Sequence, residues 1–340
     1  MLAHKLKIDT PFTFEDGSVL PSLEVAYHTS PHERRSGEKV IWICHALTAN
    51  SDAEDWWPQL VGPGKLFDTD RYFIVCVNML GSPYGSSSPA SINPATGKPY
   101  LLDFPGVTVR DMVRVIIEVR KALGIEKVDF LVGSSIGGFQ ALEWAVMEPE
   151  VILRAAFMAT TARVSAYLTA YQELQRMALD ADPTFRQAAS LEGGKEGMKC
   201  ARSIAVLSYR ANAGYIATQS EQDPDTLFAS RACSYQRYQG EKFARRFDAY
   251  CYYTLSRSVD SQNVGRGRGG VEAALRLIKA KSIVVSVDSD CIFPPCQMEE
   301  WAPMIKGATY HKITSLFGHD GFLLESSQLT DLLKPIIDEL

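Results

Sequence analysis

Short apolar runs alternate with amphipathic stretches along most of this 340-residue chain, and this alternation limits the possible folds more than any other feature. The apolar runs are long enough for buried strands, and we predict strands at 39–44, 72–77, 128–132, 154–158, 282–287 and 309–314. Stretches with helical periodicity lie between them, at 107–123, 137–147, 271–279, 297–304 and 329–339. Strands joined by helices favour an α/β fold, with a mostly parallel sheet flanked by helices.

The segment from residue 163 to residue 260 departs from this alternation. Strand patterns are absent from it, and three helical stretches appear at 166–179, 197–209 and 240–255. We therefore expect a core domain made of residues 1–162 and 261–340, interrupted once by an all-helical lid at 163–260. Such a lid can cover the carboxyl ends of the strands, where the sites of open α/β sheets lie.

One pentapeptide has the composition and the position of a turn that carries a nucleophilic serine. Gly133-Ser134-Ser135-Ile136-Gly137 fits the pattern G-x-S-x-G and falls between a predicted strand and a predicted helix. In the α/β-hydrolase fold this strand-to-helix turn holds a nucleophilic serine in a strained conformation, and the flanking glycines permit the tight turn. The alternative is a Ser/Gly turn that only caps a helix. The context favours Ser135 as a nucleophile.

A serine hydroxyl needs a base within hydrogen-bond reach before it can attack a carbonyl carbon. In this fold the chain order is serine, acid, histidine. Of the six histidines, only His311 and His319 follow Ser135. We expect His311, inside the strand 309–314, to be structural. His319 lies in the loop after that strand and is the predicted base.

The acid is expected in the loop that follows the strand 282–287, where a carboxylate can fix the tautomer of the imidazole. Asp288 and Asp290 both qualify. Spacing favours Asp290 and leaves Asp288 open, and the unused aspartate would cap the loop.

Acyl transfer also needs backbone N–H donors placed where negative charge develops on the carbonyl oxygen. The residue after the nucleophile, Ile136, is expected to supply one donor. The loop after the strand 39–44 is expected to supply the second, through Leu47. His45 in this loop precedes the serine, and we expect it to position the loop rather than to act as the base.

Charge and cysteine content exclude several other classes of function. The net charge of −5 does not favour nucleic acid as a partner, and Arg266 and Arg268 among the glycines of 265–270 are typical of a surface turn. Seven cysteines without regular spacing indicate neither a disulfide framework nor a zinc site, which fits a reducing cytoplasm. No stretch is long and apolar enough for a signal peptide or a membrane span. No metal is expected.

With these residues in place, the chain closely resembles the homoserine O-acetyltransferase family of α/β hydrolases. The resemblance runs from about residue 10 to the C-terminus. Its motifs lie at 44–48, 60–65, 68–73, 91–100, 140–144, 237–243 and 289–294. It implies that Asp290 is the acid, that acetyl-CoA is a co-substrate with no bound cofactor, and that the acceptor is L-homoserine in methionine biosynthesis. It also implies a homodimer formed through the helical lid.

The resemblance further implies two substrate-binding residues. Arg202 matches the arginine that holds the carboxylate of the amino acid, and Asp320 matches the aspartate that holds its ammonium group. Taken without the resemblance, Arg202 would be a solvated lid residue and Asp320 a loop residue that accepts backbone N–H bonds. Both residues favour an acceptor that is a zwitterion.

Three positions depart from the family pattern. Ser134 replaces a second glycine before the nucleophile, Phe139 replaces Met or Gln, and Cys291 replaces a larger residue after the acid. We expect them to border the acyl pocket and to affect the choice of acyl group. The alternatives are a succinyl donor, a serine acceptor, a plain serine esterase or a non-catalytic binding protein on the same fold. The pairing of Arg202 with Asp320 argues against the esterase, and the intact triad argues against the binding protein.

Overall fold

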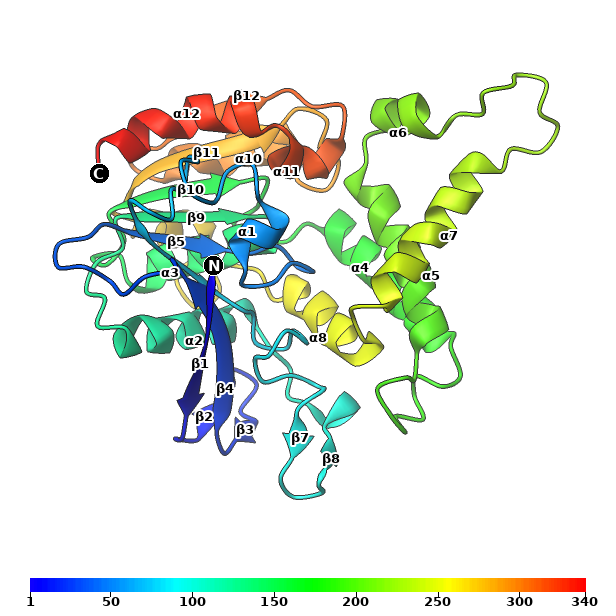
Figure 1. Ribbon diagram of the computed structural model, residues 1–340, viewed down its shortest axis with the longest axis horizontal. Helices are drawn as coiled ribbons and strands as arrows, with labels where there is room; N and C mark the ends of the chain where they lie inside the picture. The colour runs from blue at the N-terminus through cyan, green and yellow to red at the C-terminus, as the bar shows by residue number, and fades with distance from the viewer.

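An eight-stranded sheet forms the centre of the computed structural model, which describes residues 1–340 (Figure 1). Its spatial order is β1 (Leu2–Ile8), β4 (Leu23–Thr29), β6 (Phe73–Val77), β5 (Val40–Cys44), β9 (Phe130–Ser134), β10 (Arg154–Met158), β11 (Lys281–Val287) and β12 (Thr309–Ile313). The six strands from β6 to β12 run parallel, and β4 pairs antiparallel with both β1 and β6. The predicted mostly parallel sheet is confirmed.

Both faces of this sheet are buried, because successive side chains of a strand point to opposite faces. In β5, Trp42 belongs to one apolar cluster while Ile41 and Ile43 belong to another. Helices α2 (Val109–Ala122), α3 (Ile136–Met147) and α9 (Val271–Leu275) contribute to the first cluster. Helices α1 (Ala53–Trp56) and α12 (Ser326–Asp338) contribute to the second, on the opposite face. The central strands β5, β6, β9 and β10 are buried along nearly their whole length, as parallel strands between two helical layers require, whereas the edge strands β1 and β12 are partly exposed.

The remaining elements are short. Two hairpins, β2 (Phe12–Thr13) with β3 (Val19–Leu20) and β7 (Ile92–Asn93) with β8 (Lys98–Pro99), lie outside the main sheet. The other short elements are η1 (Leu101–Asp103), α10 (Pro295–Trp301), η2 (Ala302–Met304), η3 (Gly318–Asp320) and α11 (Gly321–Leu324). None of the helices combines the length and apolarity needed to cross a bilayer.

The predicted elements of the core lie where expected, with shifts at their ends that have local causes. Helix α2 begins at Val109 rather than at residue 107, because Thr108 caps it: Thr108 Oγ1 accepts from the Asp111 N–H at 3.2 Å. Strands β1 and β4 were not predicted. β1 lies at the edge of the sheet with most of its side chains exposed, so it lacks the apolar run of a buried strand.

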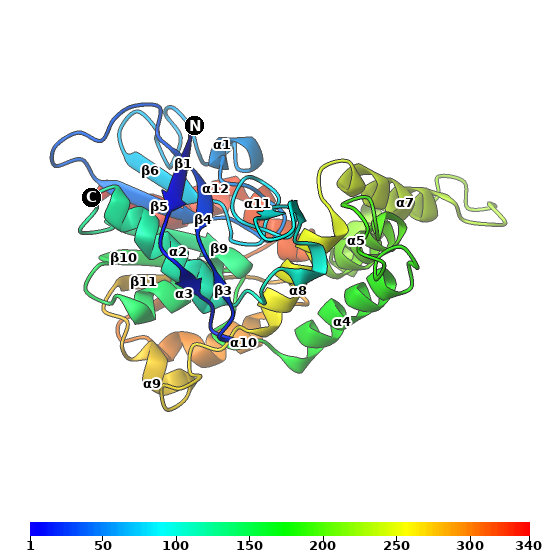
Figure 2. The same cartoon turned by 90° about the horizontal axis from the view of Figure 1, so that it is seen from below.

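Residues between β10 and β11 form a group of helices that stands at one end of the core (Figure 2). These are α4 (Ala166–Asp180), α5 (Lys195–Tyr209), α6 (Asn212–Gln219), α7 (Arg231–Ala244) and α8 (Ala249–Asp260). The chain leaves and rejoins the core side by side, since Val164 N donates to Gln262 O and Val264 N to Ala162 O, both at 3.0 Å. From this pairing we infer that residues 163–260 form the lid.

The prediction of one helix over 240–255 was wrong. The structure has two helices there, and α7 ends at Ala244 before α8 begins at Ala249. The side chain of Asp248 caps α8, because its Oδ1 accepts from the N–H groups of Tyr250 and Cys251 at 3.0 and 2.8 Å. The continuous apolar pattern of this stretch concealed the break. Helix α6 and the first half of α7 were missed.

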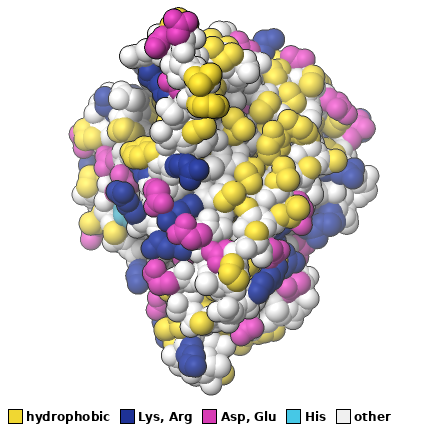
Figure 3. Space-filling model, turned by 90° about the vertical axis from the view of Figure 1, so that its right-hand side faces the viewer, with side chains coloured by type: hydrophobic (Ala, Val, Ile, Leu, Met, Phe, Trp, Pro, Cys, Tyr) yellow, Lys and Arg dark blue, Asp and Glu magenta, His cyan; other side chains and the backbone are white.

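The outer surface of the lid carries large apolar side chains that are exposed to solvent (Figure 3). They come from four of its helices and from the α6–α7 loop, and are Tyr167, Leu174, Met177, Leu207, Ile216, Leu227, Phe228 and Tyr238. Leu227 and Phe228 are more than 80% exposed. We name these eight residues the lid patch.

The segment 265–270, where the chain returns from the lid, is bound to the core through its two arginines. Arg268 makes two charge-assisted hydrogen bonds, at 2.9 and 2.6 Å, to the buried carboxylate of Glu143 on α3. Arg266 pairs with both oxygens of Glu15. Both arginines are thus engaged within the chain, and Arg268 ties the base of the lid to α3, the helix that follows the nucleophile motif.

Candidate active site

Ser135 occupies a strained turn between β9 and α3. Its φ of 58° and ψ of −128° lie in a region that residues other than glycine rarely adopt, at a cost of about 1–3 kcal/mol. Hydrogen bonds hold the turn on both sides: Ser135 N donates to Met158 O and Ala159 O, and Ser135 O accepts from Thr160 Oγ1 at 2.8 Å. The strain presents the serine hydroxyl at the carboxyl end of the parallel strands.

The two glycines of the motif are required by close backbone contacts. A Cβ on Gly133 would lie 2.2 Å from Gly137 O, and a Cβ on Gly137 would lie 2.1 Å from Cys44 O. Both distances are far below van der Waals contact with backbone atoms that cannot move independently. The glycines therefore bring the serine turn against the loop that follows β5.

The structure brings the three predicted triad residues together. His319 Nε2 lies 2.9 Å from Ser135 Oγ, and His319 Nδ1 lies 2.7 Å from Asp290 Oδ2. His319, in η3 beyond β12, is 4% exposed and packs between the rings of Phe293 and Phe322. With the proton on Nδ1 donated to the carboxylate, Nε2 is free to accept the serine proton.

The two candidate acids, both in the loop after β11, make different contacts. Asp290 is 3% exposed, and its Oδ1 accepts from the N–H groups of Ile292 and Phe293, both at 2.9 Å. Asp288 points elsewhere and accepts from Ser315 N at 3.0 Å, which ties this loop to the loop after β12. Of the two, only Asp290 touches His319.

Leu47, Ser135 and Ile136 line the same small cavity, and the backbone N–H groups of Leu47 and Ile136 have no hydrogen-bond partner. Ile136 is the first residue of α3, so its N–H has no partner within the helix, and the Leu47 N–H makes no hydrogen bond either. The cavity they line has a volume of about 20 Å³, and eight of its ten lining residues are hydrophobic. The arrangement fits an oxyanion hole beside a very small acyl pocket.

His45 holds the Leu47 loop and cannot serve as a base. Its Nδ1 donates to Ala46 O at 2.9 Å and its Nε2 accepts from Met79 N at 3.0 Å, so both ring nitrogens are engaged. Burial lowers the pKa of His45 to about 4, which keeps the ring neutral. The other alternative, His311, lies within β12 opposite Val285.

Arg202 on α5 is a partly buried cation that makes no salt bridge to a carboxylate. Its Cζ lies 4.8 Å from the ring centre of Phe243 and 5.6 Å from that of Tyr209, and its Nη1 has no hydrogen-bond partner. It lines a cavity of about 420 Å³ between the loop 46–50 and the lid. A buried guanidinium nitrogen without a hydrogen-bond partner is costly unless an acceptor completes it, so the site fits a carboxylate ligand.

Asp320, next to the candidate base, faces arginines rather than backbone donors. Its Oδ2 lies 3.2 Å from Nη2 of Arg210, and no backbone N–H donates to it. Burial raises the pKa of Asp320, while Arg210, His319 and Arg202 oppose this rise. The alternative interpretation of Asp320, as a loop residue that accepts backbone N–H bonds, is not supported by these contacts.

Two residues of this region were missed by sequence reasoning. The ring of Tyr209 lies tilted beside that of His319, with 5.8 Å between their centres, and Tyr209 lines the small cavity; Arg210 pairs with Asp320. Tyr209 follows Arg202 by two helical turns and is the last residue of α5, and Arg210 comes directly after the helix. Spacing on one helix was the only signal that could have suggested them.

The three departures from the family pattern do not all border the acyl pocket, and that expectation was wrong in part. Phe139 lines the small cavity and packs edge-on against Phe293 at 5.7 Å. Ser134 is buried with a hydroxyl that has no partner, and Cys291 Sγ donates to Ser208 O at 3.1 Å. Only Phe139 is placed to affect the choice of acyl group directly.

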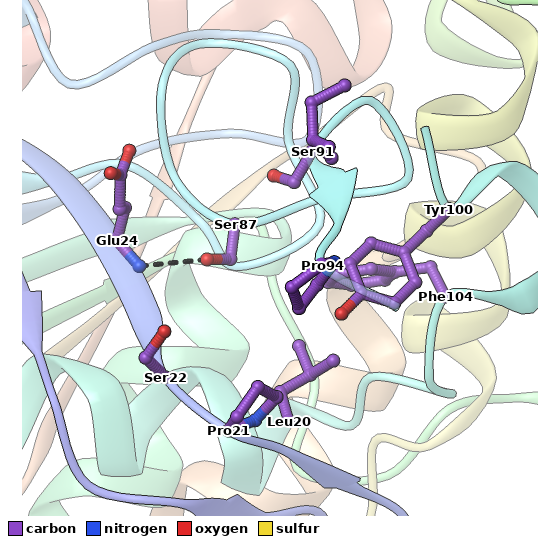
Figure 4. A pocket seen from close by; sticks show the side chains of 10 residues that line it. Leu20, Pro21, Ser22, Glu24, Ser87, Ser91, Pro94, Tyr100 and Phe104 are labelled. Carbon is purple, nitrogen blue, oxygen red and sulfur yellow. Dashed lines mark hydrogen bonds between the residues drawn. The ribbon is translucent and has the colours of Figure 1, made fainter. Parts of the chain in front are cut away.

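Another cavity, of about 370 Å³, lies between β4 and the β7–β8 hairpin, and none of the candidate triad residues lines it (Figure 4). Glu24 is its one ionisable acid, and Ser87 Oγ accepts from the backbone N–H of Glu24 at 2.8 Å. It contains neither a histidine nor a second acid, so it offers no means of activating a nucleophile. No group of three or more His, Cys, Asp or Glu side chains is arranged to hold a metal ion.

Comparison with known proteins agrees with the fold described above and identifies relatives of this chain. Residues 39–326 match the family model described as the alpha/beta hydrolase fold. The homoserine O-acetyltransferase of Cyclobacterium marinum is 40% identical over 322 residues, which cover 95% of this chain and 91% of that protein. The crystal structure of homoserine O-acetyltransferase from Staphylococcus aureus is 30% identical, with a TM-score of 0.81 over 98% of this chain and 94% of that one. Esterase E22, at 24% identity, shares the fold with a TM-score of 0.88 over 99% of this chain and all of the other.

Proposed function

Because this chain belongs to the homoserine O-acetyltransferase family of the α/β-hydrolase fold, we propose that it transfers an acetyl group from acetyl-CoA to the hydroxyl of L-homoserine through an acyl-enzyme on Ser135. The observation that carries the proposal is the contact chain from Ser135 Oγ to His319 Nε2 and from Nδ1 to Asp290, at 2.9 and 2.7 Å. The family implies a place in methionine biosynthesis, and acetyl-CoA as donor implies work in the cytoplasm.

The first half-reaction uses the triad and the two free N–H groups. His319 Nε2 takes the proton of Ser135 as Oγ attacks the thioester carbon, and the N–H groups of Leu47 and Ile136 stabilise the oxyanion. The C–S bond then breaks, and His319 gives its proton to the leaving thiolate of CoA. The product is acetyl-Ser135.

The second half-reaction repeats these steps with the acceptor. Arg202 binds the carboxylate of homoserine and Asp320 binds its ammonium group, which places the hydroxyl near His319. His319 takes the hydroxyl proton as the oxygen attacks acetyl-Ser135, and then returns a proton to Ser135 Oγ. Transfer exceeds hydrolysis because the lid holds the alcohol at a high effective concentration.

The size of the cavity beside Ser135 supports acetyl over succinyl. About 20 Å³ is room for one group the size of a water or methyl, and no cation lines the cavity. The carboxylate of a succinyl group would find no cationic partner among the residues that line this cavity, and a carboxylate buried without a partner costs several kcal/mol.

Crossing acetyl-CoA and succinyl-CoA with homoserine and serine tests the proposal. We expect CoA release and O-acetylhomoserine with the first donor, and a rate at least about 100-fold lower with succinyl-CoA. Hydrolysis of p-nitrophenyl acetate without transfer to homoserine would instead favour the plain esterase.

Replacing Arg202 with methionine is expected to impair the acceptor step selectively. The substitution keeps the apolar contacts with Phe243 but removes the charge that holds the carboxylate, so kcat/KM for homoserine should fall about 100-fold. The burst of CoA release on mixing with acetyl-CoA should stay within about twofold, since the donor lacks that carboxylate. An equal fall in both quantities would mean that Arg202 is structural.

We also propose that two copies of the chain associate through the lid patch. Eight large apolar side chains on one end of the molecule support this, because monomers rarely expose such patches (Figure 3). Sedimentation should give a dimer for the native chain and a monomer after Leu227→Asp with Phe228→Asp. A native monomer at micromolar concentration would contradict the proposal.

A further inference from the structure

The end of helix α5 touches the loops that carry both the candidate acid and the candidate base. We name residues 208–211 the lid corner. On one side, Cys291 Sγ, in the loop of Asp290, donates to Ser208 O at 3.1 Å. On the other side, a Cβ on Gly318 would lie 2.6 Å from Ala211 N and 2.7 Å from Tyr209 O. Backbone meets backbone there, so the lid corner and the loop of His319 cannot shift separately.

A second glycine contact reinforces this docking. A Cβ on Gly214, in the first turn of α6, would lie 2.0 Å from Leu316 O. The loop of His319 therefore packs against the lid at two close backbone contacts, one at Gly318 and one at Leu316. The lid is in this way part of the support of the site, in addition to covering it.

Arg210 extends from the lid corner to the carboxylate of Asp320. Its Nη2 lies 3.2 Å from Oδ2, and the two side chains are 27% and 20% exposed. Burial raises the pKa of Asp320, and Arg210 is the strongest of the groups that oppose it, followed by His319 and Arg202, while Asp290 adds to the rise. Without Arg210, the pKa of Asp320 would be higher, and a larger fraction of its carboxyl group would be protonated and therefore neutral.

We propose that Arg210 is a positioning residue for the acceptor: it binds Oδ2 of Asp320, keeps that carboxylate ionised and leaves Oδ1 for the ammonium group of the amino-acid substrate. This inference rests on the proposed function of the site. Arg202 and Arg210 then have different roles in binding the acceptor. Arg202 has an unpartnered Nη1 and is available to the substrate carboxylate, whereas Arg210 is already engaged and acts through Asp320.

The test compares Arg210→Met and Arg210→Lys in the full-length protein. Two rates are measured, the burst of CoA release from acetyl-CoA and kcat/KM for homoserine between pH 6 and pH 9. In Arg210→Met the burst should stay within about twofold while kcat/KM for homoserine falls about tenfold at pH 7. Because the pKa of Asp320 rises in this variant, the deficit should grow as the pH falls. Arg210→Lys restores a positive charge and should recover most of the loss.

A matched control is Arg186→Met, which removes another lid arginine paired with an aspartate, Asp180, away from the triad. It should change neither rate. If Arg210→Met does not fold, Arg210→Gln provides the uncharged variant. The proposal is overturned if the burst and the acceptor step fall together, or if the pH dependence for homoserine is unchanged. Failure of the native chain to acetylate homoserine would count against the proposed function instead.

Discussion

Replacing Ser135 with alanine should abolish the acetyl-enzyme and lower kcat by about 10⁵-fold, because no other oxygen lies within reach of His319 Nε2 in the turn between β9 and α3. The substitution keeps the β-carbon and the backbone hydrogen bonds of the turn, so the melting temperature should change little. Mass spectrometry of protein quenched during turnover should show an added acetyl group in the native chain and none in the variant.

The neighbouring serine provides the control for this experiment. Ser134 is buried and its hydroxyl has no hydrogen-bond partner, so Ser134→Ala leaves no group unsatisfied. Its activity should remain within a few-fold of the native value. An acetyl group trapped on another residue, or a Ser135→Ala protein that still turns over, would refute the assignment of the nucleophile.

Replacing Asp290 with asparagine should lower kcat by about 10⁴-fold through the tautomer of His319. Oδ1 of Asp290 accepts two backbone N–H groups, from Ile292 and Phe293. The asparagine must keep its oxygen there, which turns its NH₂ group toward Nδ1 of His319. Nδ1 then has to accept, the ring proton moves to Nε2, and Nε2 can no longer accept the proton of Ser135.

Asp288→Asn is the matched control, since it changes the same functional group two residues earlier in the same loop. Asp288 accepts one N–H, from Ser315, and an amide oxygen can accept it equally well. Activity should fall less than about tenfold. If the two asparagine variants lost activity to the same extent, the loop would be sensitive to charge in general and Asp290 would have no special role.

The lid contributes more to this site than its position as a cover suggests. Arg202 and Tyr209 come from α5 and Arg210 directly follows it, and the lid corner packs against the loop of His319 at Gly318. A change in the lid that displaces α5 would therefore disturb the acceptor site and the base together. Association of two copies through the lid patch would fix α5 further, which links the proposed dimer to activity.

The sequence by itself determined the parallel sheet, the position of the helical insertion and the residues of the candidate triad. These follow from local patterns, because an apolar run, a Gly-x-Ser-x-Gly turn and the loop after a strand are each specified by a few adjacent residues. In addition, the fixed order of serine, acid and histidine reduced six histidines to His319 and His311. Spacing favoured Asp290 over Asp288 but left both open, and the choice of Asp290 needed the family resemblance.

Only the tertiary structure decided the pairing of Arg210 with Asp320, the volume of the cavity beside Ser135 and the break between α7 and α8. Each depends on groups far apart in the chain. Arg210 and Asp320 are 110 positions apart, and the cavity is lined by residues from Leu47 to Phe293. Residue types and spacing record which groups are present, but the distance between side chains on different elements is set by how those elements pack.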